Sequence, residues 1–569
     1  METTRPLGPG WSSRDGVAVR GRAWTPDGRA ADLASAFAGA RSLASVAATA
    51  RRLDGFYAAV VETSDAVYLA CDHARSVPLY VDTAGRVRVS DSARDLVDGD
   101  RAWNALAASE FALTRYVTRG DTVYANVAAV RAGEVLAVPR DDPGSFRRRR
   151  YARYRPTAAT SGDESALLDA MDDVLGRVFD RVVDVADGRR VAVPLSGGVD
   201  SRLVAAMLVE RDVDVLGFTF GVHGHADVEV SRDVADALGI DWAFVEYTPE
   251  RWREWYHSAP RRDYHEYAFG GDALPFLAEW PAVKELRARG ELDDGLVCPG
   301  HTVATPSERA PESWLRDPPD ADAFVSHVLD AHYSLWAFDD PEYRAAFADR
   351  VRADAALTTE RPGPDAIPAY EEWEWTTRMA TFTNADARLY DWFDVDWWLP
   401  LWDPAYVRFW ASVPAEYRLD KRLQTEYAAR TFERVADVDA LSARWRADPA
   451  RAPRVTDADW GPVDQLRRTF ETRPRTAVDG DFEDWLGAQA VPPSSVESWG
   501  NYPLGWYGVV PREAVGTFDA ARTLYSLRTL EALERLSLRP PSVADGPLTE
   551  TLSLPPVGSD SLVGPDGRD

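Results

Sequence analysis

The segment VPLSGGVDSRL, at residues 193–203, constrains the fold of this chain more than any other stretch. It ends an apolar run in two adjacent glycines and then places an acid and a hydroxyl, Asp200 and Ser201, at the next turn. Strands that alternate with helices through short connections predict a parallel sheet covered by helices on both faces. The periodicity around the segment predicts that order: a strand at 189–195, a helix at 200–212, a strand at 213–221, a helix at 227–239 and a strand at 241–248.

The two glycines have two interpretations. One is an ordinary strand-to-helix loop capped by Ser and Asp. The other is a cradle for phosphates, because glycines let backbone N–H groups approach an anion and the next helix points its positive end at the same place. Ser196 and Ser201 would add hydroxyl donors, whereas Asp200 would repel a bare phosphate and therefore predicts a bridging Mg²⁺. The chain lacks the GxxxxGK[ST] pattern, so the loop is not of the Walker type.

The chain has an excess of acidic residues, with 92 acidic against 65 basic residues and a formal net charge of −27. This balance argues against nucleic acid or an anionic membrane as the main partner. Only two of the basic residues are lysines, Lys284 and Lys421. An acid-rich, lysine-poor composition is typical of cytosolic proteins of extreme halophiles, so we expect a halophilic protein.

Cysteine content and hydropathy set the class of protein. Two cysteines, Cys71 and Cys298, are too few for a disulfide framework or a cysteine metal cluster. No apolar stretch approaches the length of a membrane span, and the N-terminus lacks the apolar region of a signal peptide. We expect a soluble, cytoplasmic protein.

Changes in pattern along the chain predict its domains. Strand signals at close spacing before residue 140 indicate an all-β or α+β layered domain, and the tail rich in Pro, Gly, Ser and Asp indicates disorder. A further amphipathic helix is predicted at 518–536. The expected units are an N-terminal domain at 1–145, a linker at 146–165, the α/β domain at 166–440, a mainly helical extension at 441–540 and a disordered tail at 541–569.

SGGVDS resembles the pyrophosphate loop of the PP-loop ATP-pyrophosphatases, and residues 216–248 are similar to the synthetase domain of the asparagine synthetase (glutamine-hydrolysing) family. The likeness continues at 399–423, while 53–81 and 121–138 resemble later strands of the glutaminase domain of that family. The resemblance implies an α/β fold with a doubly wound parallel sheet, of the PP-loop or adenine nucleotide α-hydrolase type, with helical additions. It also implies a preceding α+β, Ntn-like layered β domain.

The resemblance also implies roles for residues of this chain. Asp200 would hold Mg²⁺, Phe220 would contact adenine, and Lys421 would act on the transferring acyl group and the α-phosphate of ATP. A compact ammonium there would offset negative charge as pyrophosphate leaves. The ATP loop itself carries over onto Leu195, Ser196, Gly197, Gly198, Val199, Asp200 and Ser201.

The second phosphate loop departs from the family pattern SGEGxDE, because the chain has PGHTVAT at 299–305. Pro299 and Gly300 keep the turn that would touch the nucleotide. His301, Ala304 and Thr305 stand where acids are expected. Either Asp272 or Glu308 substitutes as an acid, or metal binding is weak, or catalysis is lost. His301 would contact pyrophosphate as a cation or play a structural role.

The pocket for the acyl substrate also departs from the family. Arg388 matches the family pattern, while Asp396 replaces a glutamate and Trp398 an arginine. We expect Arg388 and Asp396 to face the substrate. His223 and His225 are expected to shape the nucleotide pocket or to face solvent.

The N-terminal domain lacks the cysteine that glutamine hydrolysis requires at the mature N-terminus, because position 2 is Glu2. Cys71 lies inside a predicted strand and is not expected to replace it. We therefore expect a degenerate glutaminase domain without activity.

Together these features predict an ATP-dependent ligase that adenylates a carboxylate, releases pyrophosphate, and transfers ammonia or an amine. ATP and Mg²⁺ are the expected cofactors, and the expected partners are small molecules, with a homodimer also possible. Two alternatives stay open: an intramolecular amide ligase similar to the β-lactam synthetases, and a non-catalytic pseudo-enzyme that binds a nucleotide or a partner.

Overall fold

The structure is a computed structural model. It describes residues 7–437, with gaps at 27, 31, 98–101, 158–159, 161, 222, 224–225, 336–339, 356 and 358–364, together with residues 528, 529 and 531–533. Most of the predicted extension at 441–540 and all of the predicted tail at 541–569 lie outside the described residues. Of the predicted helix at 518–536, residues 528, 529, 531 and 532 are described as helical.

The strands are β1 (Ser12–Arg14), β2 (Val17–Thr25), β3 (Gly28–Arg29), β4 (Asp54–Glu62), β5 (Ala66–Cys71), β6 (Tyr80–Asp82), β7 (Arg88–Ser90), β8 (Val127–Ala129), β9 (Glu134–Pro139), β10 (Arg147–Arg150), β11 (Val191–Pro194), β12 (Val215–Gly221), β13 (Asp241–Glu246), β14 (Leu296–Val297) and β15 (Asp396–Trp397). The helices are α1 (Leu33–Phe37), α2 (Leu43–Arg51), α3 (Ala105–Thr114), α4 (Glu164–Ala186), α5 (Val199–Val209), α6 (Ala226–Leu238), α7 (Pro249–His257), α8 (Ala259–Ala268), α9 (Trp280–Ala288), α10 (Thr305–Arg309), α11 (Ala321–His332), α12 (Pro341–Asp354), α13 (Ala366–Glu374), α14 (Ala387–Trp392), α15 (Pro404–Ser412), α16 (Ala415–Arg418) and α17 (Arg422–Ala436).

The α/β part is built on a five-stranded sheet of order β13-β12-β11-β14-β15, in which every pair of neighbours is parallel. This confirms the predicted α/β fold class and its parallel sheet. The chain adds strands outward from β11 to β13 and then returns to place β14 on the other side of β11. The carboxyl ends of β11 and β14 therefore flank the point where the strand order reverses, which is where ligands bind in open α/β sheets.

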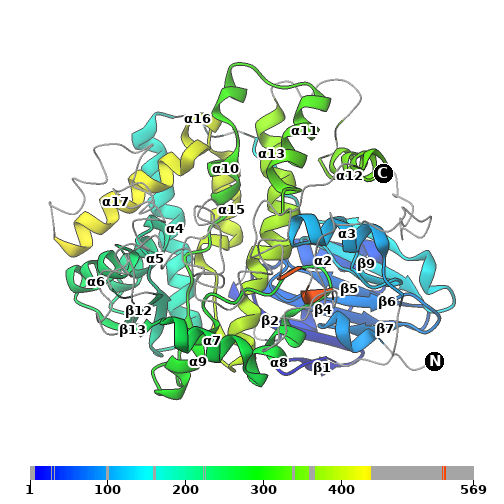
Figure 1. Cartoon of the computed structure of the whole chain (residues 1–569), viewed down its shortest axis with the longest axis horizontal. Coiled ribbons are helices and arrows are strands. Elements are labelled where there is room, and N and C mark those ends of the chain that lie inside the picture. The colour runs from blue at the N-terminus through cyan, green and yellow to red at the C-terminus, as the bar shows by residue number, and fades with distance from the viewer. Residues whose placement is uncertain are drawn as a thin grey trace, which may run out of the picture.

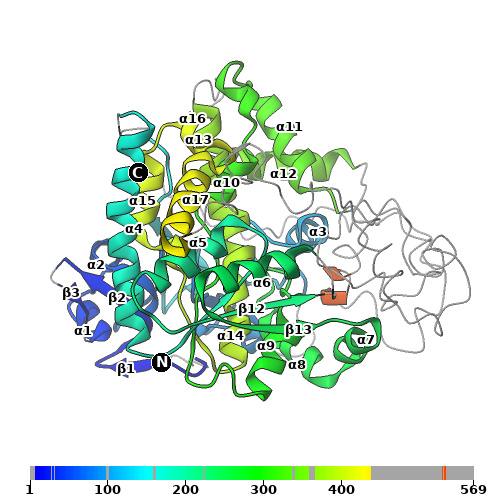
Figure 2. The same ribbon diagram turned by 90° about the vertical axis from the view of Figure 1, so that its left-hand side faces the viewer.

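Helices cover the parallel sheet because their apolar residues recur at helical spacing. The 23-residue helix α4 buries Leu168, Met171, Leu175 and Val182 on one face. Helices α5 and α6 lie beside β12 (Figure 2), and α17 packs against both α4 and α5. Helix α17 is thereby held against α5, the helix that begins within SGGVDS.

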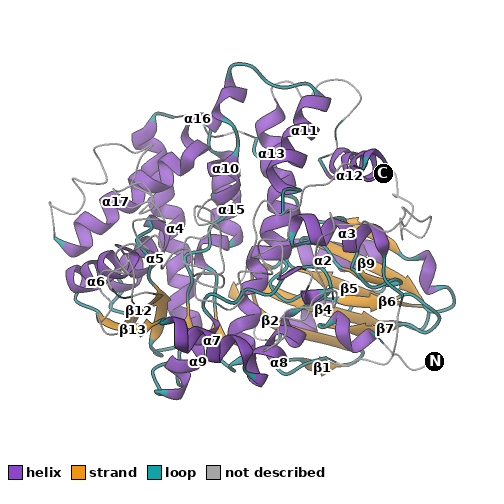
Figure 3. Ribbon diagram, viewed as in Figure 1, coloured by secondary structure: helices purple, strands orange, loops and turns teal. Residues whose placement is uncertain are grey.

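The N-terminal part is a helix–sheet–sheet sandwich. Helices α1 and α2 cover one face of a seven-stranded antiparallel sheet, and the three-stranded sheet β7-β6-β8 covers the other. Figures 1 and 3 show β4 and β5 of the first sheet beside β6 and β7 of the second. Successive side chains of β4 point to opposite faces of the sheet and so contribute to two separate hydrophobic cores. Tyr57 and Ala59 face the helices, whereas Ala58 and Val60 face the second sheet. This layered arrangement agrees with the α+β expectation.

Buried ion pairs join the N-terminal part to the α/β part. Arg75 contacts Asp272 at 2.5 Å, and Asp272 also accepts a hydrogen bond from Tyr80 at 2.9 Å. Arg350 of α12 contacts Glu110 of α3 at 2.9 Å. Removing one partner from a buried ion pair leaves the other charge buried and unpaired, which is strongly destabilising. These ion pairs therefore hold the N-terminal part and the α/β part together.

Among the helices that the structure describes, none is both long enough and apolar enough to cross a membrane.

Candidate active site

The SGGVDS loop leaves the carboxyl end of β11 and opens α5, as the sequence predicts. The Ser196 amide donates to the Ser201 hydroxyl oxygen at 3.2 Å, and the Gly198 amide donates to the Ser196 hydroxyl oxygen at 3.2 Å. Gly198 is the N-cap of α5 and has no side chain to cap the helix. The loop is thus tightly wound, and the positive end of α5 faces the site without a capping side chain of its own.

A carboxylate from α6 reaches this loop. The Gly197 amide donates to Asp227 Oδ1 at 3.2 Å, and Asp227 lies in the first turn of α6. A backbone N–H that binds a carboxylate oxygen is able to bind a phosphate oxygen in the same way. Sequence analysis missed Asp227, because nothing in its spacing connects it with residue 197.

The second loop, PGHTVAT, lies directly against the first. Gly300 sits so close that a Cβ added to it would lie 2.6 Å from the Ser201 amide nitrogen and 2.9 Å from the Ser201 Cα. Only a glycine allows this approach. Gly300, preceded by the buried Pro299, therefore meets the SGGVDS loop at the reversal point of the sheet.

Lys421 reaches the same place from a position 221 residues along the chain. Its Nζ lies 3.0 Å from Asp200 Oδ2 and 3.2 Å from Glu308 Oε2, and its side chain is 12% exposed. Burial alone would lower the pKa of Lys421, but the carboxylates of Asp200 and then Glu308 outweigh it and raise the pKa above its usual value. Lys421 is a fixed ammonium at the mouth of the loop.

The backbone at Lys421 is unusual. Both Asp420 and Lys421 adopt left-handed conformations with φ of 53°, and Lys421 is the residue that precedes α17. Such conformations are costly for residues other than glycine and tend to occur at functional sites. This turn directs Lys421 toward the loop while α17 continues away along α5.

Gln424, one turn into α17, holds Asp200 in place. It donates to Asp200 Oδ1, and its own carbonyl oxygen accepts from Tyr406 at 2.6 Å and from Thr302 at 2.9 Å. Gln424 is fully buried, so this network ties the second loop to the carboxylate of the first. Sequence analysis missed Gln424, although its spacing of three from Lys421 places both on one side of the α17 start.

Glu308, rather than Asp272, is the further acid that lies beside Lys421 and Asp200. Asp272 is occupied by Arg75 and Tyr80 at the contact with the N-terminal part, away from the loops. Glu308, in the short helix α10, shares Lys421 with Asp200. No group of three His, Cys, Asp or Glu side chains that would hold a metal occurs among the described residues. Two carboxylates near a triphosphate nevertheless fit Mg²⁺, which is usually held by one or two carboxylates plus phosphate oxygens.

Phe220 lies near the carboxyl end of β12, at the same edge of the sheet. It is partly buried and stacks on Tyr247, with ring centroids 5.4 Å apart. Leu195 is buried beneath the loop, and its amide donates to the Phe218 carbonyl oxygen at 2.8 Å. These placements agree with a nucleotide-binding edge, with one aromatic face beside it.

The structure does not bring Asp396 and Arg388 to this site, which corrects our expectation for both. Asp396 opens β15 and pairs in register with Leu296, which pairs with Val191 at the start of β11. It therefore lies at the amino edge of the sheet, where it binds Arg22 and Arg189. Arg388 donates to the Tyr267 carbonyl oxygen at 2.9 Å and covers the Tyr267 ring. Because β15 is only two residues long, a residue at its start lies at the amino edge of the sheet and a residue just after it lies at the carboxyl edge.

His301 lies in the second loop, where burial disfavours the charged form of its imidazole. Burial lowers its pKa to about 4, so the imidazole is neutral at pH 7. Its Nε2 lies 3.7 Å from Asp386 Oδ2, and burial, followed by the charge of Glu279, raises the pKa of Asp386 well above its usual range. His223 is exposed in a turn, and His225 lies outside the described residues. Cys71 is fully buried, and burial raises the pKa of its thiol, which leaves it unreactive.

Glu279, next to Asp386, predicts a pH effect on stability. Burial raises its pKa from 4.5 to about 7, and the hydrogen bond from Tyr390 at 2.8 Å offsets only part of this. Glu279 is protonated in both the folded and the unfolded chain below pH 4.5. As pH rises from 4.5 through 7, the unfolded chain loses this proton more easily than the folded one, so the folded state becomes less stable. Glu279→Gln is therefore expected to leave stability unchanged at pH 4.5 and to increase it at pH 8 by up to about 3 kcal/mol.

Thermal unfolding at both pH values checks this expectation, with Glu266→Gln on the exposed face of α8 as the control. Equal effects of Glu279→Gln at the two pH values would contradict it.

Parts of this chain are similar to known proteins. A family model described as asparagine synthase matches residues 174–471. The tRNA-specific 2-thiouridylase MnmA of Bartonella henselae is 32% identical over 159 residues, which cover 25% of this chain and 38% of that protein. MnmA of Parvibaculum lavamentivorans is 30% identical over 193 residues, which cover 29% and 47%. The chain thus spans less than half the length of these relatives.

A solved NH3-dependent NAD synthetase from Campylobacter jejuni, in complex with nitrate, matches 34% of this chain and 96% of its own at 14% identity, with a TM-score of 0.20. That TM-score is too low to support an argument. The family model, in contrast, covers more than half of the 569 residues and includes both loops and Lys421. This chain belongs to the asparagine synthase family.

Proposed function

We propose that this protein is an ATP-dependent ligase that adenylates a carboxylate, releases pyrophosphate, and joins the acyl group to ammonia or an amine. One observation carries the proposal: Lys421 Nζ lies 3.0 Å from Asp200 and 3.2 Å from Glu308, beside the glycine loop at the reversal point of the sheet. Family membership supports the use of ATP. The net charge of −27 supports small-molecule substrates over a tRNA.

In the first step, a carboxylate oxygen of the substrate attacks the α-phosphorus of ATP. The bond between that phosphorus and the bridging oxygen breaks, and pyrophosphate leaves with the electron pair. The departing phosphates would be bound by the amides of Gly197 and Gly198, the hydroxyls of Ser196 and Ser201, and the positive end of α5. Lys421 neutralises the charge that develops on the bridging oxygen.

In the second step, the lone pair of ammonia or an amine attacks the acyl carbon, and AMP leaves with the bonding electrons. The proton that the amine loses passes to solvent. Asp200 and Glu308 would hold Mg²⁺, which supplies positive charge to the phosphates when it is bound. Most of the rate then comes from orientation and charge stabilisation.

Product analysis tests this function. The full chain, incubated with ATP, Mg²⁺, ammonium and a panel of carboxylates in molar potassium chloride, is expected to form AMP and pyrophosphate with at least one carboxylate. An intramolecular ligase would form them from a substrate without added ammonium. A pseudo-enzyme would bind ATP without forming either product, and that result would overturn the proposal.

Asp227 is expected to weaken ATP binding, because it and a phosphate compete for the Gly197 amide. Asp227→Asn removes the charge that repels the phosphates and leaves a poorer acceptor at 3.2 Å. The affinity for α,β-methylene-ATP, measured by calorimetry, is expected to rise about fivefold. Asp233→Asn, on the exposed face of α6, is the control. Weaker binding would show that Asp227 assists the nucleotide instead.

Glu308 is expected to set the requirement for Mg²⁺. Glu308→Gln removes one of the two carboxylates beside Lys421 and leaves the side-chain size unchanged. The Mg²⁺ concentration for half-maximal pyrophosphate release is expected to rise about tenfold. Glu312→Gln, four residues along and exposed, is the control. An unchanged Mg²⁺ dependence would remove Glu308 from the site.

A further inference from the structure

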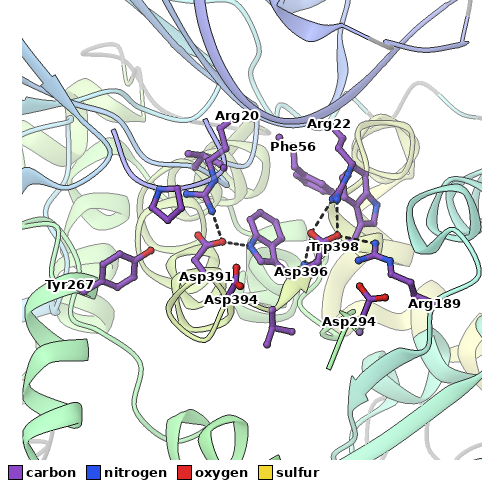
Figure 4. Close-up of a pocket in the computed structure, with 17 residues that line it drawn as sticks. Arg20, Arg22, Phe56, Arg189, Tyr267, Asp294, Asp391, Asp394, Asp396 and Trp398 are labelled. Carbon is purple, nitrogen blue, oxygen red and sulfur yellow. Dashed lines mark hydrogen bonds and ion pairs between the residues drawn. The ribbon is translucent and has the colours of Figure 1, made fainter. Parts of the chain in front are cut away.

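A second cavity, of about 420 Å³, lies between the N-terminal sandwich and the amino edge of the parallel sheet (Figure 4). Its walls come from β2 and β4 on one side and, on the other, from the residues that begin or precede β11, β14 and β15. The SGGVDS and PGHTVAT loops leave the opposite edge of that sheet. The cavity is therefore separate from the proposed active site.

Aromatic rings form part of its lining. Phe56, Trp397 and Trp398 are all buried, and the Phe56 and Trp398 rings meet edge to face with centroids 4.6 Å apart. Tyr267 adds a fourth ring to the lining. Aromatic faces attract cations, most strongly where water is excluded.

The arginines of the lining are already bound to carboxylates. Arg22 contacts Asp396 through two hydrogen bonds, of 3.0 and 2.7 Å, and Arg189 contacts the same carboxylate at 2.9 Å. Arg20 contacts Asp391 at 2.5 Å, and Trp397 donates to that carboxylate as well. Because these guanidinium groups are occupied, the cavity offers little to an anion.

Two further carboxylates of the lining face the cavity without such partners. Asp294 and Asp394 are exposed at the rim of the cavity, where Figure 4 shows both, and their side chains have no hydrogen bond or ion pair with any described residue. Both residues adopt left-handed conformations, with φ of 52° and 53°, in the turns that lead into β14 and β15. The lining thus combines three guanidinium groups with four carboxylates, an excess of negative charge.

We propose that this cavity binds a small organic cation, an ammonium compound of about the size of an amino acid. The charged group pairs with Asp294 and Asp394, and the aliphatic part rests against Phe56 and the Trp397 and Trp398 rings. Carboxylates combined with aromatic faces are the chemistry that recognises ammonium groups. The proposal does not depend on ATP or on the proposed ligase activity.

Calorimetric titration of the full chain with choline tests this site, with 3,3-dimethylbutan-1-ol as its uncharged isostere. Choline is expected to bind one to one with a dissociation constant below about 1 mM, and the isostere at least tenfold more weakly. The double variant Asp294→Asn, Asp394→Asn is expected to lose at least tenfold in choline affinity. Asparagine tolerates the left-handed conformation, so the variant keeps the turns.

The matched control is Asp187→Asn, Asp212→Asn, which makes the same change at two exposed aspartates with φ of 50° and 54°. It is expected to bind choline like the wild type. Equal binding of choline and the isostere, an unaffected Asp294/Asp394 variant, or no binding at 10 mM choline would overturn the proposal. A thermal melt of each variant confirms that the fold is intact.

Discussion

Lys421→Met is expected to abolish carboxylate-dependent pyrophosphate release, with a loss of at least about 10²- to 10³-fold. Methionine keeps the length of the aliphatic chain and removes the ammonium that lies 3.0 Å from Asp200. The variant then lacks the ammonium that would neutralise the bridging oxygen as pyrophosphate leaves. Radiolabelled exchange between pyrophosphate and ATP measures the loss, because exchange reports adenylation alone.

The chain provides its own control, because its only other lysine is Lys284. Lys284 lies over the Trp280 ring at 5.4 Å, in α9. Lys284→Met is expected to keep the exchange rate of the wild type. If Lys421→Met also keeps full exchange while its melting temperature is unchanged, Lys421 has no role in adenylation.

Gly300→Ala is expected to separate the two loops. The added Cβ would lie 2.6 Å from the Ser201 amide nitrogen, and the atoms in its way belong to the backbone, which cannot rotate aside. Overpacking of this kind costs about 1–3 kcal/mol. Part of that cost is expected as a shift of the PGHTVAT loop, so the affinity for α,β-methylene-ATP falls at least about tenfold.

Gly39→Ala is the control for this substitution, since a Cβ there meets nothing within 4 Å. It is expected to change neither stability nor nucleotide affinity. Wild-type affinity in Gly300→Ala would mean that the second loop does not contribute to the nucleotide site.

The α/β part of the fold was predictable from local pattern. Strands and helices from β11 to β13 lie where the alternation of periodicity places them, because each buries a continuous apolar face. Helices α1, α2 and α3 were not predicted individually, since five- to ten-residue helices bury few residues each. Their apolar positions serve a sheet core whose partners lie far away in sequence.

The candidate site was predictable only in part. The SGGVDS loop is contiguous, so its chemistry is visible in the sequence. The convergence of Lys421 on Asp200 followed from family resemblance alone, because no local pattern links residues so far apart. Asp227 and Gln424 act through the arrangement of α6 and α17, which becomes visible only in three dimensions.

The sequence-based prediction put Asp396 at the wrong edge of the sheet for a physical reason. Residues after a strand of a parallel sheet meet at the carboxyl edge, whereas residues before it meet at the amino edge. Asp396 is the first residue of β15, and the strand ends one residue later. The family pattern located the segment correctly but could not tell the two edges apart. Asp396 instead lines the second cavity, at the amino edge of the sheet.

The most direct measurement is the binding of α,β-methylene-ATP to the wild-type chain, by calorimetry in molar potassium chloride with Mg²⁺ present. The converging loops and Lys421 predict one site per chain, with a dissociation constant at or below about 100 μM, that pyrophosphate competes for. Absence of binding at millimolar nucleotide, or binding that Lys421→Met and Gly300→Ala both leave unchanged, would contradict a nucleotide site at the reversal point of the sheet.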